Sequence, residues 1–486
     1  MITTSETGAD TGSESNVTER QHKVRWLALL VLGLGLFIGV VESSIINMSM
    51  PAMQEEFSAT DSEMLMLVTI FSLVFASSVL LFGKIGHVFG LRRLQAAGAG
   101  LFGLSSLLIG LAPSLEFVNA MRIFAGLAAA MGAASGMALV HSIFKGKERA
   151  LAFGLWGATA SLGAAIGPVI GGLAVTYFSW RMAFFIVVPI SLFIVIGCRR
   201  WIVEIKHEQV GSIDYLGAAI IGAGLFAIIL ALIYGPIWGW WTAETDLSIL
   251  GISLVPWLLM LGFVLSFVLF PHWLHKREVQ GEVPIFDLGL LRVHSFRGGM
   301  LASFARQIAQ FTPFFALAIF LEKTAGWPAS KTGLVFVMSA VGGMIAGPLS
   351  GWLANRWGTK PVVIAGKTLM AIAVLWILLV IDANINPAML LGPLFLFGVS
   401  IGLAAAQLNT VIMSEVPLSK AGDASAAKSS IGRVGNSFGA ALVGILLAIS
   451  IEDVLIMALI FIIIALALAF TLPNIKEGGG EVAAGA

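Results

Sequence analysis

Residues 83–93 read GKIGHVFGLRR and residues 351–361 read GWLANRWGTKP, so one short pattern occurs twice in the chain. The outer glycines of the two copies, Gly83 with Gly90 and Gly351 with Gly358, superimpose, and each copy then has a basic end. Each copy also follows a long apolar run. Internal repeats of this kind are typical of membrane transporters built from two related halves. The repeat therefore predicts a chain that folds as two similar bundles of helices.

The composition excludes a water-soluble globular protein. Of the 486 residues, 58% are hydrophobic and only 11% are charged, and the mean hydropathy is +0.96. So much apolar surface cannot be buried in a soluble core, and it indicates a polytopic membrane protein. The net charge of +1 gives no indication of nucleic-acid binding, and the single Cys198 excludes an internal disulfide framework.

Apolar runs of about 20 residues, the length that a helix needs to cross the hydrocarbon layer, occur fourteen times. They begin near Trp26, Met64, Leu94, Phe117, Ala150, Met182, Asp214, Leu250, Arg297, Lys331, Val362, Ala388, Lys428 and Asp453, and the last ends near Leu472. The sequence thus predicts an all-α polytopic membrane protein with fourteen transmembrane helices. An even number of spans places both termini on one side of the bilayer.

Lysine and arginine decide which side that is, because the cytoplasmic loops of membrane proteins are enriched in them. The N-terminal tail and every second loop contain most of these residues, among them Arg20, Lys23, Arg25, Lys84, Arg92, Arg93, Lys145, Lys147, Arg149, Arg199, Arg200, Lys276, Arg277, Arg356 and Lys360. The other loops contain few, and the main ones are Arg181, Lys323 and Lys331. Both termini are therefore expected in the cytoplasm.

The domain boundaries follow from the spans, the repeat and the polar segments. We expect a disordered cytoplasmic tail over residues 1–24, an N-terminal six-helix bundle over 25–204, two inserted transmembrane helices over 205–272, a cytoplasmic linker over 273–296, a C-terminal six-helix bundle over 297–474 and a cytoplasmic tail over 475–486. The N-terminal tail is rich in Ser, Thr, Glu and Gly and lacks the apolar core of a signal peptide.

One acid lies inside the first apolar run. Glu42 is 17 residues beyond Arg25, roughly 25 Å along the helix and in the outer part of the bilayer. Arg122 lies six residues below Glu116 in the descending fourth span, at a matching depth. An ionisable group inside a membrane is costly and indicates a function, so we expect this pair to bind and release a proton. The alternatives are a static ion pair and a Glu42 that reaches the outer interface.

Span nine contains a second group of polar residues. Arg306, Gln307 and Gln310 share a helix face, and Arg306 lies about 14 Å beyond Arg297, near the bilayer midplane. We expect these side chains to face a central substrate cavity, where Arg306 binds an anionic or zwitterionic substrate or pairs with a carboxylate or with carbonyl groups. Arg433, at the inner end of span thirteen, is expected to snorkel toward the interface.

The fifth span contains glycines at a spacing of four. Gly163, Gly167 and Gly171 lie on one helical face, where they let a neighbouring helix approach closely. Pro168 frees a backbone carbonyl and permits a bend. Such a face is common in ordinary membrane packing, so the spacing alone leaves a purely structural role open.

The repeated loops resemble motif A of the major facilitator superfamily. Residues 121–126, which include Arg122, resemble its motif B, and the span-five glycines with Pro168 resemble motif C of its antiporters. Residues 180–186 and 213–217 are similar to markers of the fourteen-span drug:proton antiporter branch. The resemblance covers nearly the whole chain.

This resemblance implies the major facilitator fold, with two six-helix bundles and two inserted helices. It implies proton-coupled efflux of drugs or other small amphipathic molecules by alternating access, in the cytoplasmic membrane of a bacterium. Glu42 and Arg122 would couple protons, and the motif of Gly163, Gly167, Pro168 and Gly171 would limit leak. The residues of the gating loops would be Gly83, Gly90, Arg92, Arg93, Gly351, Arg356 and Gly358.

Both copies of motif A depart from the family pattern. The family has an acid where this chain has His87, and the second copy has Asn355 at that position. Gating is therefore expected to depend on other contacts, such as those of Arg92, Arg93 or Arg356. His87 is expected to be a solvated loop histidine, and titration near neutral pH is the alternative.

Catalytic motifs find no support in the sequence, and we expect no enzyme. Gly366-Lys367-Thr368 resembles the end of a phosphate loop, but position 361 is proline where the loop needs glycine. The histidines and Cys198 show no spacing typical of a metal site or a hydrolase, so neither a metal nor a cofactor is expected.

Three functions remain open. The first is a proton-coupled exporter of drugs or other small molecules. The second is a dedicated exporter of an anionic or zwitterionic metabolite, such as a siderophore or antibiotic, which Arg306 favours. The third is a sensor or assembly partner that no longer transports, because both motif A acids are missing. The expected partners are a small-molecule substrate, protons and the lipid bilayer, with the protein acting as a monomer.

Overall fold

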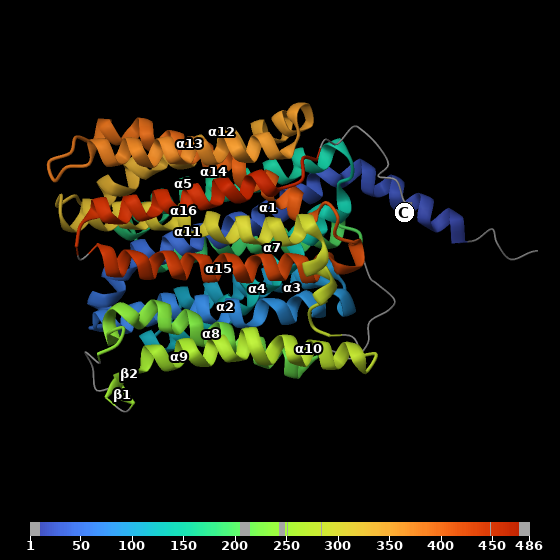
Figure 1. The fold of residues 1–486 in the computed structure, drawn as a ribbon, viewed down its shortest axis with the longest axis horizontal. Helices are drawn as coiled ribbons and strands as arrows, with labels where there is room; N and C mark the ends of the chain where they lie inside the picture. The colour runs from blue at the N-terminus through green and yellow to red at the C-terminus, as the bar shows by residue number, and fades with distance from the viewer. Residues whose placement is uncertain are drawn as a thin grey trace, which may run out of the picture.

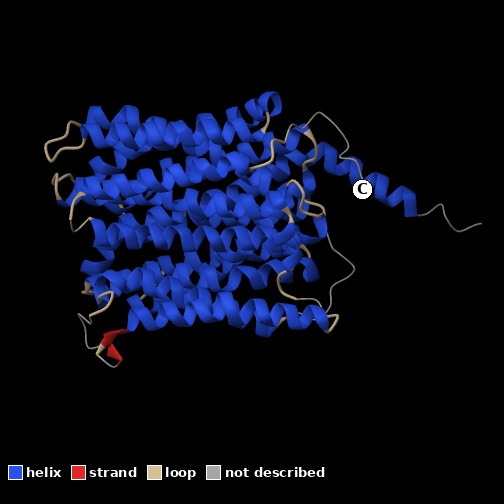
Figure 2. Ribbon diagram, viewed as in Figure 1, coloured by secondary structure: helices blue, strands red, loops and turns tan. Residues whose placement is uncertain are grey.

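The computed structural model describes residues 10–204, 214–242, 248–249, 251–282, 284–447 and 449–475. They form a bundle of long helices that run side by side along one direction (Figure 1). Helix makes up nearly all of the described ribbon, and the short hairpin of β1 (Ser248–Ile249) and β2 (Ile252–Ser253) stands apart from it (Figure 2). Helices suit a membrane because each backbone N–H and C=O is bonded within its own segment.

The first half of the chain forms the helices up to α7. Their bounds are α1 Asp10–Phe57, α2 Asp61–Phe89, α3 Leu91–Gly110, α4 Leu115–Ile143, α5 Lys147–Tyr177, α6 Trp180–Phe185 and α7 Val187–Trp201. The adjoining α6 and α7 form one membrane-length segment. Residues 1–9 of the predicted tail over 1–24 lie outside the described residues, and the rest of that segment belongs to α1.

The inserted helices and the second half follow. Their bounds are α8 Tyr215–Trp238, α9 Leu254–Phe263, the π-helix η1 Val264–Leu269, α10 Phe270–Val279, the 3₁₀ helix η2 Leu288–Arg292, α11 His294–Lys323, α12 Ala329–Trp357, α13 Thr359–Val380, α14 Pro387–Met413, the 3₁₀ helix η3 Leu418–Lys420, α15 Ala421–Leu446 and α16 Ile451–Thr471. The predicted C-terminal tail lies almost entirely outside the described residues.

Eleven helical segments in the described part of the chain are long and apolar enough to cross a membrane. Three further helices, α3, α5 and α15, contain 20, 31 and 26 residues. They run alongside the eleven in the same bundle (Figure 1). The largest buried apolar cluster centres on the first half, and a second cluster lies within α11 to α16 and the loops between them.

The two halves pack on each other where the repeated loops begin. α2 packs on α15, and α12 packs on α5. A Cβ added at Gly83 of α2 would lie 3.1 Å from the Gly422 carbonyl oxygen of α15. A Cβ added at Gly351 of α12 would lie 2.6 Å from the Leu151 Cα of α5. The ends of the two halves that are predicted to be cytoplasmic are therefore in close backbone contact.

The inserted helix α8 lies where the halves meet, because it packs on α2 of the first half and on α15 of the second. A Cβ added at Gly222 of α8 would lie 2.8 Å from the Ser77 carbonyl oxygen of α2. A Cβ added at Gly444 of α15 would lie 2.6 Å from Pro236 Cγ of α8. α8, α9 and α10 together form one edge of the bundle (Figure 1). The insertion thus covers the contact between α2 and α15.

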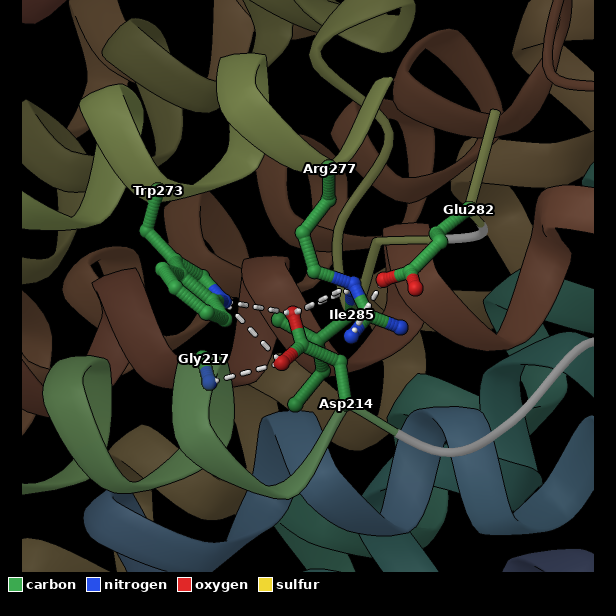
Figure 3. A network of polar contacts seen from close by, with 6 residues as sticks. All are labelled: Asp214, Gly217, Trp273, Arg277, Glu282 and Ile285. Atoms are coloured by element: carbon green, nitrogen blue, oxygen red, sulfur yellow. Dashed lines mark hydrogen bonds and ion pairs between the residues drawn. The ribbon is translucent and has the colours of Figure 1, made fainter. Parts of the chain in front are cut away.

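A buried carboxylate at the start of α8 holds the linker in place. Asp214 Oδ1 accepts hydrogen bonds from Gly217 N at 2.8 Å and from Trp273 Nε1 at 3.0 Å. Asp214 Oδ2 accepts one from Ile285 N at 3.4 Å, and Arg277 Nε lies 4.0 Å from the same oxygen (Figure 3). One side chain thus joins α8, α10 and the linker that follows.

Asp214→Ala is expected to loosen this linker. The substitution leaves the buried N–H groups of Trp273 and Ile285 without their acceptor, and an unpaired buried group costs about 1–3 kcal/mol. We expect faster tryptic cleavage after Arg277 in the purified protein. Asp214→Asn keeps one acceptor oxygen, so its cleavage rate should lie between the two. A rate in Asp214→Ala equal to that of the unmodified protein would contradict this role.

Candidate functional site

A buried ion pair joins α1 to α4. Glu42 Oε1 lies 2.8 Å from Arg122 Nη1, and the two side chains are 0% and 2% exposed. Arg122 Nε donates to the Leu67 carbonyl oxygen of α2 at 3.2 Å. The guanidinium carbon lies 4.3 Å from the centroid of the Phe71 ring, also on α2. The structure thus brings together the two residues that the sequence places at one depth.

The second carboxylate oxygen of Glu42, Oε2, is buried and has no hydrogen-bond partner among the described residues. A buried ion pair is stable only while both partners are charged, because loss of one charge leaves the other uncompensated. A proton that binds Glu42 therefore changes the electrostatic balance around Arg122, which contacts both α1 and α2. The arrangement can act as a proton-binding site whose state affects three helices.

The glycine face of α5 packs directly on the helix that carries Glu42. A Cβ added at Gly163 would lie 3.0 Å from the Phe37 carbonyl oxygen of α1. At Gly167 the added atom would lie 2.6 Å from Ser44 Cβ. At Gly171 it would lie 3.3 Å from the Ile45 Cα.

These three positions bracket Glu42 along α1, so the close approach of α5 supports the segment that carries the acid. The side chain of Pro168, the fourth member of the predicted motif, lies outside the described residues.

Phe71 connects the ion pair to the second half of the molecule. Its ring contacts Arg122 and also Arg433 of α15, whose guanidinium carbon lies 5.5 Å from the Phe71 centroid. The same guanidinium carbon lies 4.4 Å from the Phe75 centroid. Arg433 therefore stacks on α2 inside the molecule, whereas the sequence favoured a snorkelling position.

A cavity of about 400 Å³ lies between the two halves. Helices α1 to α5 form one wall, which is mainly apolar and includes Phe71, Phe75, Phe102 and Trp156, with Gln95 as a polar member. Helices α11 and α15 form the opposite wall, and their lining residues are Ser303, Gln307, Lys428, Ser429, Gly432, Arg433 and Asn436. The second wall thus consists of polar residues, two cations and one glycine. A ligand here would touch both halves at once.

The three cavity residues expected from span nine occupy different environments. Gln307 lines the cavity. Arg306 is 7% exposed and lies behind the lining, where its Nη1 donates to Gln310 Oε1. Arg306 Nε is buried without a hydrogen-bond partner in the described part of the chain. Lys428, which the sequence placed only at the start of a span, is a lining residue.

The first of the predicted gating loops contacts an acid that the sequence did not single out. Gly90 has a φ of 102°, a left-handed conformation that favours glycine, and a Cβ there would lie 2.3 Å from Glu204 Oε1. Glu204 Oε1 accepts a hydrogen bond from Arg92 N at 3.1 Å. Glu204 Oε2 lies 3.3 Å from Arg92 Nε and 3.5 Å from Arg93 Nε. Glu204 thus caps α3 and pairs with both basic residues of the loop.

The second predicted gating loop repeats this arrangement with an amide in place of the acid. Gly358 has a φ of 94°, and Asn474 Oδ1 accepts a hydrogen bond from Lys360 N at 3.3 Å. Arg356 lies with its guanidinium carbon 5.9 Å from the Trp352 ring centroid. The two halves are alike in this respect. Glu204 follows α7 and caps α3, and Asn474 follows α16 and caps α13. The side chain of His87 lies outside the described residues.

Glu204→Ala is expected to destabilise the first gating loop. The change removes a helix cap, which costs about 0.5–2 kcal/mol, and leaves Arg92 and Arg93 without their carboxylate. We expect a lower midpoint of thermal unfolding in detergent. Glu204→Gln restores the cap but not the charge, so it should recover part of the loss. Equal unfolding midpoints for Glu204→Ala and the unmodified protein would show that Glu204 does not stabilise this loop.

The described residues contain no group of three or more His, Cys, Asp or Glu side chains that could hold a metal ion.

Comparison with known proteins identifies the family. The sequence matches the Major Facilitator Superfamily over residues 32–291 and 298–484. It is 29% identical over 428 residues to the multidrug resistance protein Stp of Mycobacterium tuberculosis, covering 88% of this chain and 76% of that protein. It is 30% identical over 436 residues to the puromycin resistance protein pur8 of Streptomyces alboniger, covering 88% and 83%.

The solved structures agree on the fold. The human organic anion transporter MFSD10 (TETRAN) superposes with a TM-score of 0.68 at 13% identity, covering 92% of this chain and 99% of that one. At this identity the likeness concerns the fold alone. The family match, the helix bundle and the superposition together show that the chain belongs to the Major Facilitator Superfamily, and that it is a multi-pass membrane protein of the transporter type.

Proposed function

We propose that this protein is a proton-coupled exporter of drugs or other small molecules, of the fourteen-span branch, that works by alternating access. The observation that carries the proposal is the buried pair of Glu42 and Arg122, because ionisable groups inside a membrane indicate a functional site and a proton relay is one common kind. The names of the relatives, which include multidrug and puromycin resistance proteins, support small-molecule export.

The span count of fourteen adds α3, α5 and α15 to the eleven apolar segments. With fourteen spans both termini lie on one side, and from the distribution of Lys and Arg we infer that this side is the cytoplasm of a bacterial cell. The repeated loops at Gly83 and Gly351 then lie on the cytoplasmic side. Because Gly83 packs on α15 and Gly351 packs on α5, we infer a state that is closed toward the cytoplasm.

The effect of proton binding would pass from Glu42 to Arg122, then to α2, and then to the cavity. A proton on Glu42 neutralises the carboxylate, and Arg122 then loses its counter-charge. The guanidinium remains bonded to the Leu67 carbonyl and stacked on Phe71, so its displacement would be transmitted to α2. Phe71 also contacts Arg433, a lining residue of the cavity. The proton site and the cavity therefore share one aromatic ring.

Alternating access needs the helices around Glu42 to move without opening a leak. The glycines of α5 give a smooth surface on which α1 can shift, since no side chain at Gly163, Gly167 or Gly171 interlocks with it. We infer that this face keeps α1 and α5 in contact in both states and so limits passage of protons around the pair.

Transport in proteoliposomes under an imposed pH gradient tests the proposal. Lipophilic cations, zwitterions and anionic amphiphiles should be offered in parallel. We expect accumulation of at least one class that disappears when an ionophore collapses the gradient. Transport that is indifferent to the gradient would contradict proton coupling. Binding without any transport would favour a sensor or assembly partner.

A further inference from the structure

The polar wall of the central cavity has two cations and no carboxylate among its described lining residues. The two cations are Lys428 and Arg433. Arg306 of α11 is buried and is not a lining residue, and it acts electrostatically both on Lys428 and on Lys367 of α13. Lys367 is 1% exposed. Four cations thus gather on the second half of the molecule.

Two of these cations, Arg306 and Lys367, are buried without an opposite charge. Lys367 Nζ and Arg306 Nε are buried and make no hydrogen bond to any described residue. None of the four is in an ion pair in the described structure, whereas the buried Arg122 is paired with Glu42. Burying unpaired charges is costly, and proteins normally offset it with an opposite charge. The missing charge in this half is negative.

The opposite wall accepts a different kind of group. Phe71, Phe75, Phe102 and Trp156 line it, together with alanines and glycines of α3 and α4. Aromatic and small apolar side chains bind flat apolar bodies. A cavity of about 400 Å³ is the size of a small-molecule site. The two walls therefore favour a molecule with one apolar side and one charged side.

We propose that the cavity binds amphipathic organic anions, in which a carboxylate, sulfonate or phosphate faces Lys428 and Arg433 and an apolar ring system lies against the aromatic wall. Arg306 and Lys367 add positive potential from behind the lining. This inference rests on the proposed exporter function, because it names the cargo of the same cavity. An anionic cargo is opposite in charge to the proton that moves against it.

Three probes that share one apolar body test the charge preference in full-length protein in nanodiscs. They are naphthalene-2-sulfonate, 2-naphthyltrimethylammonium and 2-naphthol, with inorganic phosphate as a fourth ligand, and binding is measured by calorimetry. The sulfonate should bind most tightly, at least roughly tenfold more tightly than the ammonium compound, because a charge-assisted hydrogen bond is replaced by repulsion. Phosphate should compete only weakly, since it lacks the apolar body.

Charge removal tests the named residues. Lys428→Gln should weaken sulfonate binding roughly tenfold or more, and Lys428→Arg should keep it. The matched control is Lys331→Gln, which changes a lysine that stacks on Trp327 at the start of α12. If Lys428→Gln does not fold, the charge series on the unmodified protein still decides. The inference is overturned if the ammonium compound binds as tightly as the sulfonate, if phosphate alone competes equally, or if folded Lys428→Gln binds the sulfonate unchanged.

The experiments distinguish failure of the proposed anion site from failure of the proposed exporter function. Gradient-driven transport of cations with no binding of the sulfonate would leave the exporter in place and remove the anion site. Specific sulfonate binding without any gradient-driven transport would leave the site in place and remove the exporter.

Discussion

Glu42→Gln is expected to abolish uphill, proton-driven export while the same substrate still exchanges across the membrane down its gradient. The amide has the shape of the carboxylate but cannot gain and lose a proton near neutral pH. Arg122 loses its counter-charge permanently, so the variant resembles the protonated state. Everted vesicles energised by a pH gradient measure the uphill step, and substrate counterflow in the absence of a gradient measures exchange.

Folding must be separated from coupling in this experiment, because breaking a buried pair can cost about 3–5 kcal/mol. The double variant with Glu42→Gln and Arg122→Gln removes both charges and should recover stability without recovering coupling. Glu56→Gln is the matched control, since Glu56 is also on α1 and pairs with Arg181 at 2.7 Å, but its side chain is 42% exposed. Full uphill export by Glu42→Gln would exclude this carboxylate as the proton site.

Gly351→Leu is expected to lose most transport and to shift the protein away from the state seen here. A Cβ at this position would lie 2.6 Å from the Leu151 Cα and 2.9 Å from its nitrogen, so α5 and α12 would have to separate. Overpacking costs about 1–3 kcal/mol, which corresponds to roughly a 5–150-fold shift between two states. A cysteine at Ala150, which is 1% exposed, should then react faster with an impermeant maleimide applied from the cytoplasmic side.

The labelling needs a background without the native thiol, so Cys198→Ser is included in every variant. Gly172→Leu in α5 is the control, because a Cβ there meets no atom within 4 Å. It should leave both transport and labelling near their original values. Unchanged labelling and transport in Gly351→Leu would show that close contact of α5 and α12 is not part of the cycle.

Much of the architecture could be predicted from the sequence because a lipid bilayer restricts the secondary structures that can cross it. Apolar runs had to be helices, and their length and polarity predicted the helix bundle. Depth along a helix is also predictable from the rise per residue, and for that reason Glu42 and Arg122 could be placed at one level. Their contact at 2.8 Å agrees with that estimate.

Other features depend on which way a helix faces and on contacts between distant segments, and the sequence does not show these. Lys428 appeared only as a basic residue at the start of a span, and Arg433 as a snorkelling residue, although both line the cavity. Arg306 was expected to face the cavity together with Gln307, but it is buried and is not a lining residue, because consecutive residues of a helix point about 100° apart. Glu204 caps a helix that begins more than a hundred residues earlier, so no local pattern indicates it.

A substrate gradient should drive protons through the protein by way of Glu42. Proteoliposomes with a trapped pH indicator are loaded with a compound that the gradient screen shows to be transported, and are then diluted. We expect efflux of the compound through the unmodified protein to change the internal pH by drawing protons inward. With Glu42→Gln the compound should still leave, and the internal pH should stay constant. An equal pH change with both proteins would contradict the assignment of Glu42 as the proton-coupling residue.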